Sequence, residues 1–518
     1  SRFGKYMRIQ CNQAGAPVGG VINVYLLEKS RVVTRAVDER SFHIFYNILA
    51  GATDSELSKW KLTRSHDQYR YLSLSECYTV DTINDKTDYH AVLAAMKTLE
   101  FDSTIKDGVF QVCAAILHLG NITFGGGEKS QVASDSKASL KTTAELLCVK
   151  EEALEKALTM RTVSAGGRSV LTPLSEKDAA YARDAFAKSL YEKCFLRIVF
   201  DINRVIENTK LSPKEEVDIG LLDIYGFEVF ETNSFEQLMI NYTNEKLQQV
   251  FIELTLKAEQ EEYQREGIEW TPIEYFNNRV ICELIEGKPK GIIAFMDESC
   301  LLGRTTDKGF LDKLSQNFGK HAHYQDTNTS RDKSIGFNCF RLKHYAGDVV
   351  YSVVGMLDKN SDQLFRDLIG LAIGSTDKVI ASLFDPAQLD TKKRPVTAGT
   401  QFRSSVQALI AMLMACEPHY IRCIKPNDQK AANMINEERT RHQIRYLGLV
   451  ENLRVRRAGF AFRSPFSRFI RRYKMTSSVT WPNFKGAGGE KGGVEALLKE
   501  HGVTSANQRL GKTKVFLK

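Results

Sequence analysis

The spacing of apolar residues near the start of the chain predicts a strand followed by a helix. The run VINVYLLEKSRVV (21–33) is rich in β-branched residues, as strands are. The next stretch, DERSFHIFYNILAGA (38–52), has a helical period. Its residues Phe42, Phe45, Ile48 and Leu49 fall on one stripe, which we interpret as a face that packs into a core.

Helical periodicity continues through most of residues 53–215 and then dominates one long segment. The turn-rich stretches GGGEKSQVASDSK and SAGGRSVLTP break the first region. The long segment NSFEQLMINYTNEKLQQVFIELTLKAEQEEYQRE begins at a capping Asn233 or Ser234. Glu236 or Gln237 is placed to complete a capping box. Because the apolar stripe fades toward a charged C-terminal end, we expect one helix of about 45 Å that leaves the core.

Further apolar runs predict strands and a buried helix, and one strand carries unexpected polar residues. FRLKHYAGDVVYSV and PHYIRCIKPND predict strands, and SVQALIAMLMAC between them predicts a buried helix. LLDIYGFEVF (221–230) reads as a buried strand until Asp223 interrupts the apolar run. Gly226 and Glu228 follow at once. An acid, a glycine and a second acid do not serve core packing, so we treat them as candidates for chemistry.

Composition and charge argue against several classes of protein without selecting one. The 518 residues include 71 Lys and Arg against 63 Asp and Glu, a net charge of +8, which is a mild bias that does not imply nucleic acid. Ten cysteines without a C-x-x-C pair argue against a disulfide framework. We find no run of eighteen apolar residues and no secretion leader, so neither a membrane span nor a secretion signal is predicted.

The strand that ends in Asp223 suggests a phosphate site. P-loop NTPases place an acid at a strand end to orient water on Mg²⁺, and a glycine amide that follows can approach the γ-phosphate. The phosphate loop itself has the pattern G-x-x-x-x-G-K-[ST]. Its only candidate here is Gly511-Lys512-Thr513, where Ala506 replaces the first glycine. Within this sequence we therefore expect no complete phosphate cradle.

Two widely separated stretches together resemble the myosin motor domain. SRFGKYMRI is similar to the end of the family's switch I, and DIYGFEVF…NSFEQLMINYTNEKLQQVF is similar to switch II running into the relay helix. ERSFHIFYNILAGA, HYAGDVVY, PHYIRCIKPND, RYLGLVENLRVRRAGFAFR and GKTKVF follow in the family's order and resemble class I, the single-headed unconventional myosins. The resemblance implies an α/β, P-loop NTPase-like myosin head, in which many helices surround a central mixed β-sheet, plus a small α+β converter. It also implies that the P-loop and purine-binding residues lie upstream of Ser1.

The resemblance divides the chain into four consecutive segments. Residues 1–215 would hold the end of switch I and the upper 50K-like subdomain. Residues 216–402 would hold switch II, the relay helix and the lower 50K-like actin-binding subdomain, ending in loop 2. Residues 403–459 would supply a central-sheet strand and the hinge helices, with Gly459 as the point of flexure, and residues 460–518 the converter.

The resemblance assigns roles around ATP and Mg²⁺. The Ser1 hydroxyl is implied as a Mg²⁺ ligand, and Asp223 as an acid that acts on the metal through water. Gly226 would donate its amide to the γ-phosphate and serves both binding and catalysis. Arg2 would pair with Glu228, and such an Arg–carboxylate fork is directional enough to report whether two loops have closed. Catalysis would then come from positioning water and stabilising charge, with no covalent intermediate.

The resemblance also assigns surfaces to F-actin. Lys392, Lys393 and Arg394 align with loop 2, which meets acidic residues of actin. FMDESCLLGRTTDKGF is similar to an actin-docking helix-loop-helix in which Leu301 and Leu302 would supply apolar contact. From the residues alone, a solvated basic turn and core packing of the two leucines remain alternatives.

One further loop suggests regulation, and the resemblance implies partners outside this sequence. TVSAGGRSVLTPLS aligns with an actin-facing loop that bears an acid or a phosphorylatable residue, here Ser169. Phosphorylation there would add charge at an interface. Calmodulin or a calmodulin-like light chain would bind C-terminal to this chain, and a tail would bind membrane. The implied location is the cytoplasm, at the actin cytoskeleton and cell cortex.

The resulting hypothesis is an actin-activated Mg²⁺-ATPase that converts phosphate release into lever rotation. An alternative is a nucleotide-insensitive actin tether that keeps the fold but has lost turnover. A third, a nucleic-acid-binding module built on the arginine-rich stretch 439–474, lacks a stacking platform of aromatic residues. The intact set of Arg2, Asp223, Gly226 and Glu228 favours the enzyme, and we expect no nucleic-acid partner.

Overall fold

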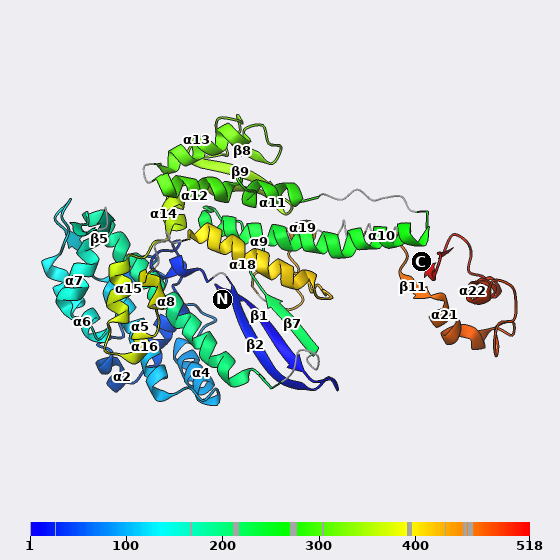
Figure 1. Ribbon diagram of the computed structural model, residues 1–518, viewed down its shortest axis with the longest axis horizontal. Helices are drawn as coiled ribbons and strands as arrows, with labels where there is room; N and C mark the ends of the chain where they lie inside the picture. Colours follow the sequence, from blue (N-terminus) through cyan, green and yellow to red (C-terminus); the bar gives the residue numbers. More distant parts are fainter. Residues whose placement is uncertain are drawn as a thin grey trace. The chain divides into compact units, whose positions relative to one another are not determined.

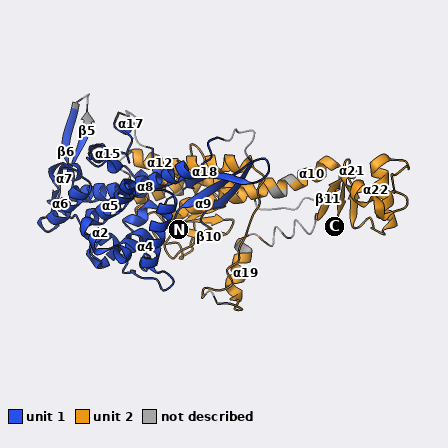
Figure 2. Ribbon diagram, turned by 90° about the horizontal axis from the view of Figure 1, so that it is seen from below, with its two compact units in different colours: residues 1–225, 358–398 blue, residues 226–357, 399–518 orange. Residues whose placement is uncertain are grey.

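The computed structural model separates into two compact units, which Figure 2 distinguishes by colour. It describes residues 2–25, 27–165, 168–210, 217–269, 277–302, 305–390, 396–429, 431–447, 449, 453 and 459–518. Unit 1 comprises residues 1–225 and 358–398, and unit 2 comprises residues 226–357 and 399–518. Within the described ranges, no helix combines the length and the apolarity needed to cross a bilayer.

Unit 1 is built around a helical core. Its helices are α1 His43–Gly51, α2 Asp54–Lys59, α3 Arg70–Ser73, α4 Asp85–Thr98, α5 Ser103–Gly120, α6 Lys137–Leu146, α7 Glu151–Thr159, α8 Glu176–Ile206, α15 Arg366–Ile373, α16 Lys378–Ala381 and α17 Ala387–Asp390. The predicted stripe is confirmed for Phe45, Ile48 and Leu49, which are fully buried in this core. Phe42 is the N-cap residue just before α1, and it is partly buried and packs against the same core. The predicted helical character of residues 53–215 is likewise confirmed for most of that range.

A three-stranded antiparallel sheet accompanies these helices, with strand order β2-β1-β7 (Figure 1). The strands are β1 Gly4–Cys11, β2 Pro17–Tyr25 and β7 Val217–Asp223. The strand predicted at Asp223 is therefore present, but the prediction that it is buried is wrong. Val217, Ile219 and Leu221 are each 45–55% exposed. The reason is that β7 is an edge strand, which among the described residues pairs only with β1.

A hairpin replaces one predicted loop of unit 1. The stretch SAGGRSVLTP was expected to be a turn-rich break, yet β5 Met160–Ala165 and β6 Arg168–Pro173 pair across it in antiparallel register. The β-branched residues valine and threonine suit a strand, and pairing satisfies its backbone groups. A second, shorter hairpin joins β3 Phe124–Gly125 and β4 Gln131–Val132 in the other predicted break.

Unit 2 is organised along the predicted long helix. The helix runs as α9 Phe235–Phe251, the π-helical segment η4 Ile252–Lys257 and α10 Ala258–Glu266. Ser234 is its N-cap, and the Gln237 side chain accepts from the Ser234 backbone N–H at 3.1 Å, so the predicted capping box is confirmed. Gly267 ends it with a positive φ of 72°, the left-handed conformation that glycine adopts without a steric penalty.

Shorter elements surround this helix. They are α11 Arg279–Glu286, α12 Ile292–Leu302, α13 Asp307–Phe318, α14 Met356–Ser361 (which ends in unit 1), α18 Ala398–Met414, α19 Glu437–Tyr446, β8 Tyr324–Asp326, β9 Cys339–His344 and β10 Gly347–Ser352. The two strands predicted from FRLKHYAGDVVYSV are confirmed as β9 and β10, which pair as an antiparallel hairpin. β8 completes a three-stranded sheet on the other side of β9.

The region after α18 departs from the prediction. The stretch PHYIRCIKPND was expected to be a strand, but the structure assigns no strand there, and Ile421 is 87% exposed. An apolar run becomes a strand only when another strand accepts its hydrogen bonds, and none of the described residues does so. The helix predicted just before it exists within α18, but the prediction that it is buried is largely wrong. In the stretch SVQALIAMLMAC only Val406 and Leu409 are buried, and the other residues are half-buried or exposed.

The last part of unit 2 has its own small core. It contains β11 Phe462–Pro465, α21 Phe466–Tyr473, α22 Gly489–Glu500, β12 Gln508–Leu510 and β13 Lys514–Leu517. The strand order is β11-β13-β12, all antiparallel. Apolar side chains of α21, α22 and β13 pack together, including Phe466, Phe469 and Val515. Residues 460–518 therefore form an α+β body, as predicted.

Candidate functional site

Asp223 is the last residue of β7, where the sheet ends. Its register partner is Lys5, whose Nζ lies 3.5 Å from Asp223 Oδ2. The Asp223 side chain is 64% exposed, so the carboxylate can meet water or a ligand. A strand fixes the backbone direction while its end leaves the side chain accessible, which suits an acid that acts through water.

Arg2 engages a carboxylate that sequence reasoning did not identify. Its Nε and Nη2 donate to Glu28 Oε2 and Oε1 at 2.6 and 2.9 Å. Burial alone raises the pKa of Glu28, but hydrogen bonding from Arg2 and the charge of Arg31 lower it below the ordinary value, so Glu28 is held as a carboxylate. The Arg2 guanidinium also lies 5.1 Å from the centre of the Tyr225 ring. The pairing of Arg2 with Glu228 stays a prediction, and Ser1 lies outside the described residues.

On the unit 2 side, the backbone of Glu228 is clasped by a buried asparagine of α9. The Glu228 N–H donates to Asn241 Oδ1 at 2.8 Å, and Asn241 Nδ2 donates back to the Glu228 carbonyl at 2.7 Å. The same Nδ2 donates to the Tyr351 hydroxyl of β10 at 2.9 Å. Because both backbone groups of Glu228 are bonded to one side chain, displacement of this backbone must displace α9 or break the clasp.

A second asparagine fastens the start of the helix in the same way. Asn233 Oδ1 accepts from the Phe230 N–H at 2.8 Å, while its Nδ2 donates to the carbonyls of Phe230 and Val350 at 2.9 and 3.1 Å. Asn233 also forms a parallel bridge with Tyr351. The segment between Gly226 and the helix is thus bonded at two points to structured elements of unit 2.

A fully buried polar network supports the first clasp. The Tyr351 hydroxyl is 2.8 Å from His344 Nε2, and His344 Nδ1 is 2.9 Å from Glu245 Oε1. Asn278 Nδ2 donates to Glu245 Oε2 at 2.9 Å. The Phe227 ring meets the His344 ring edge to face, with centroids 5.2 Å apart. Among the described residues, the buried Asn278 Oδ1 has no hydrogen-bond partner. The remaining contacts restrict the Tyr351 hydroxyl to one orientation, so they help to set the position of Asn241.

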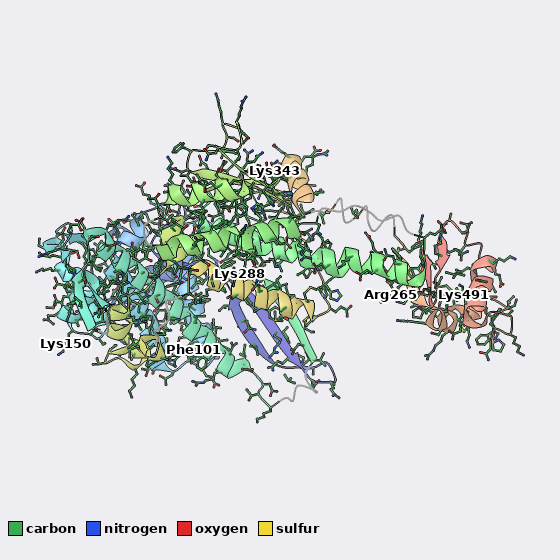
Figure 3. The ribbon with its side chains drawn as sticks, turned by 45° about the horizontal axis from the view of Figure 1, so that its top comes forward. Phe101, Lys150, Arg265, Lys288, Lys343 and Lys491 are labelled. Carbon is green, nitrogen blue, oxygen red and sulfur yellow. The ribbon has the colours of Figure 1, made fainter. Side chains whose placement is uncertain are left out.

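The far end of the same helix is joined to residues 460–518 by acidic side chains. Glu266 Oε1 accepts from the Thr513 hydroxyl at 2.6 Å and Oε2 from the Thr513 N–H at 2.8 Å. Glu262 pairs with Lys514 Nζ at 2.6 Å and with Arg463 Nη1 at 2.7 Å. Arg265 marks this end of α10 in Figure 3. The charged C-terminal end that the sequence displayed is therefore a junction between elements.

Aromatic packing completes that junction. Tyr263, Ile268, Phe460 and Phe516 form a buried cluster. The Tyr263 ring lies 5.8 Å from Phe460 and 5.6 Å from Phe516, both edge to face, and its hydroxyl accepts from the Phe460 N–H at 3.0 Å. Such a cluster holds the end of the helix against residues 460–518, since close-packed side chains do not yield independently.

The helix is not uniform between its two ends. The six-residue segment η4 Ile252–Lys257 has π-helical hydrogen bonding. π segments are rare and occur mainly at functional sites, and their irregular ladder is a place where helices bend. One residue before it, Phe251 packs edge to face on Tyr420 at 4.9 Å and lies under the Arg422 guanidinium at 4.8 Å. Sequence periodicity could not reveal this irregularity, because the residues of η4 are ordinary helix formers or β-branched.

The predicted helix-loop-helix is present as α12 and α13. Leu301, near the end of α12, is 55% exposed, as the docking role requires. Thr306 caps α13 by accepting from the Gly309 N–H at 3.1 Å, and Lys313 pairs with Glu298 at 2.7 Å. The side chain of Leu302 lies outside the described residues, as do Lys392, Lys393 and Arg394.

Ser169 lies exposed on β6, opposite Ser164 in the hairpin register. Its neighbours Val170 and Leu171 are 53% and 41% exposed. The base of the hairpin is anchored by Thr162, whose hydroxyl and N–H donate to Asp367 at 2.6 and 2.9 Å. A rigidly anchored hairpin that exposes apolar side chains has the character of a contact surface.

The described residues do not form a self-contained metal site. Among them, no group of three or more His, Cys, Asp and Glu side chains could hold a metal ion. The exposed Asp223 carboxylate nevertheless fits Mg²⁺, which keeps several waters and is usually bound by one or two side chains together with phosphate oxygens.

Comparisons with known proteins agree on one family. The family model for the myosin head (motor domain) matches residues 1–518. The chain is 52% identical to Myosin IE heavy chain of Dictyostelium discoideum, 49% to Unconventional myosin IC of Drosophila melanogaster and 46% to Unconventional myosin-Ic of Gallus gallus. Each match covers 100% of this chain and 50–52% of the relative, so the chain spans about half the length of these curated relatives.

Proposed function

Because this chain belongs to the myosin motor-domain family, and to its class I members, we propose that it forms part of an actin-based motor that hydrolyses Mg-ATP. The fold is accordingly that of the P-loop NTPase-like myosin head, and the α+β body of residues 460–518 would be its converter. The proposal extends to actin-activated ATPase activity, with a P-loop supplied upstream of Ser1. Switch II would couple that activity through the relay helix to converter rotation and actin affinity.

In this proposal, residues at the ends of two segments bind and orient the nucleotide. Ser1 would ligate Mg²⁺, which would neutralise phosphate charge, and Asp223 would hold a water of the metal. Gly226 would donate its amide to the γ-phosphate. Closure of Arg2 against Glu228 would align the attacking water, and opening would release phosphate.

The observation that carries the proposal is that one helix is bonded to both ends of the coupling route. Asn241 of α9 clasps the Glu228 backbone, and Glu266 of α10 binds Thr513. A displacement of the Glu228 backbone by a hydrogen-bond length would move the helix, and the attached body would move with it. The π-helical segment between them is the natural place for a change in helix direction.

Partners and location follow the same proposal. F-actin would meet the basic loop Lys392, Lys393 and Arg394 and the apolar tip at Leu301 and Leu302. Phosphorylation of Ser169 would regulate this contact. Calmodulin or a related light chain would bind beyond Lys518, and a tail would attach to membrane. The motor would act in the cytoplasm, at the cortical actin cytoskeleton.

The test is a phosphate-release assay on the full-length protein with and without F-actin. An actin-stimulated rate supports the motor. Actin binding that ignores ATP, together with no phosphate release, would instead identify a nucleotide-insensitive tether.

A further inference from the structure

The positive charge of the chain is concentrated in residues 460–518. This segment carries twelve Lys and Arg residues but three Glu, a net charge of +9, whereas the whole chain carries +8. The remainder of the chain is therefore close to neutral. Arg463 and Lys514 are neutralised by Glu262 at the helix junction, so the excess belongs to the other surfaces of this body.

Three of these charges form one stripe on α21. Arg468, Arg471 and Arg472 are exposed at helical spacing, while Phe466 and Phe469 on the opposite face are buried. Among the described residues, no carboxylate pairs with any of the three arginines, although Arg472 lies 5.7 Å from the Tyr473 ring centre. A cluster of like charges without counterions is unfavourable unless an external anion compensates it.

Exposed apolar side chains continue this stripe. Met475, at the next helical position, is 72% exposed, and Val479 and Trp481 are 54% and 52% exposed. Lys474 Nζ lies 5.6 Å from the Trp481 ring centre and donates to the Pro482 carbonyl at 2.9 Å. The basic and the apolar groups therefore belong to one continuous surface, which we name the α21 face (468–481).

We propose that the α21 face binds an anionic lipid bilayer surface. Arginine matches phosphate geometry, and basic residues near an anionic surface are attracted by its potential. Tryptophan beside basic residues is typical of segments that lie in the headgroup region. A nucleic acid would satisfy the arginines but would leave Met475, Val479 and Trp481 unexplained. This inference is independent of ATP hydrolysis and actin binding.

The experiment follows Trp481 in the full-length protein. Vesicles of phosphatidylcholine and phosphatidylserine with brominated acyl chains quench a tryptophan that enters the headgroup region. We expect quenching that disappears in Trp481→Phe, that weakens with salt, and that is absent with phosphatidylcholine alone. Each arginine near an anionic surface contributes about fivefold in affinity, so Arg468→Gln, Arg471→Gln and Arg472→Gln together should weaken the association of the α21 face about a hundredfold. The Trp481-dependent quenching should fall accordingly, even where the proposed tail still holds the protein on the vesicle.

A matched control removes three exposed charges elsewhere. Lys137→Gln, Lys141→Gln and Lys150→Gln on unit 1 change the net charge equally and should leave the Trp481 signal unchanged. The arginine variants are exposed, so circular dichroism should report unaltered folding. The proposal is overturned if anionic vesicles give no Trp481-dependent quenching, if neutral vesicles quench equally, or if the control triple variant weakens binding as much.

Discussion

Asn241 connects three groups at the residue scale, and no shorter or apolar side chain could do the same. It accepts from the Glu228 N–H and donates to the Glu228 carbonyl and the Tyr351 hydroxyl, while being fully buried itself. A buried backbone group that loses its partner costs about 1–3 kcal/mol. The clasp thus stabilises the fold and also ties the segment that contains Glu228 to a helix.

Asn241→Ala should lower the free energy of unfolding by about 2 kcal/mol, because it leaves the backbone N–H and C=O of Glu228 without the hydrogen bonds that Asn241 provides. It should also reduce the rate of movement on actin more than it reduces the affinity for ATP. Urea unfolding measures the first effect. Asn317→Ala is the control, since exposed Asn317 bonds only to the Lys313 carbonyl of its own helix, and it should cost less than about 0.5 kcal/mol. If both variants lose the same free energy of unfolding, the stabilising role of Asn241 is contradicted.

Glu228→Ala tests the predicted closure with Arg2. ATP binding should remain near normal while hydrolysis is severely slowed, because the closed arrangement is needed only for chemistry. Measuring the affinity for ATP and the steady-state turnover of the full-length protein separates the effect on binding from the effect on hydrolysis. Turnover within about twofold of wild type would refute the assignment.

At the scale of elements, the junction between α10 and residues 460–518 depends on ionised carboxylates. Burial tends to raise the pKa values of Glu262 and Glu266, but hydrogen bonds from Lys514 and Thr513 respectively lower both below the ordinary 4.5. A lowered carboxyl pKa in the folded state contributes stability that is fully present above the unfolded pKa. That stability is lost as pH falls through the folded value.

The junction should therefore loosen below about pH 4.5. Hydrogen exchange in β12 and β13 should accelerate as pH falls through this range, after correction for intrinsic exchange. A variant with Glu262→Gln and Glu266→Gln should exchange rapidly already at pH 7 and respond little to acid. If wild type and the double variant keep the same difference in protection down to pH 3, the carboxylates do not hold the junction.

The β5–β6 hairpin is the element on which regulation is predicted. Ser169 is exposed beside apolar side chains, so added negative charge there changes the surface without disturbing a core. Ser169→Glu should give higher actin-activated turnover than Ser169→Ala, and the two should have the same turnover without actin. If Ser169→Glu and Ser169→Ala have equal actin-activated turnover, Ser169 has no regulatory role of this kind.

At the scale of the whole molecule, the basic loop is expected to speed the encounter with actin. Replacing Lys392, Lys393 and Arg394 by glutamine should slow association at low salt, and added salt should shrink the difference from wild type. Stopped-flow association with F-actin measures this. Lys485→Gln, Lys499→Gln and Lys518→Gln remove the same charge from residues 460–518 and should have little effect. A loop variant with an unchanged association rate would exclude steering.

Chain order does not reproduce the division into compact units. Residues 358–398 return to unit 1 after the chain has built much of unit 2. The four consecutive segments inferred from the resemblance cannot represent this return, and they stay a prediction. Long-range packing decides which segments share a core, and it joins residues far apart in sequence.

Local pattern sufficed wherever neighbouring residues determine structure. It predicted α1 and its buried stripe, the capping box at Ser234, the strand character of FRLKHYAGDVVYSV and the polar positions Asp223 and Glu228, because periodicity, capping and interrupted apolar runs are all properties of adjacent residues. The same reasoning failed for PHYIRCIKPND and for the burial of β7, since pairing and burial require partners supplied by other parts of the chain.

The sequence by itself determined the family, the periodic elements and the candidate acids, because these reside in residue identity and spacing. Only the tertiary structure decided that Arg2 meets Glu28, that Asn241 clasps Glu228 and that Glu266 binds Thr513. Each of these contacts is selected by geometry among many chemically equivalent donors and acceptors. The physical reason is that a hydrogen bond requires a distance and an angle that residue type and spacing along the chain do not specify.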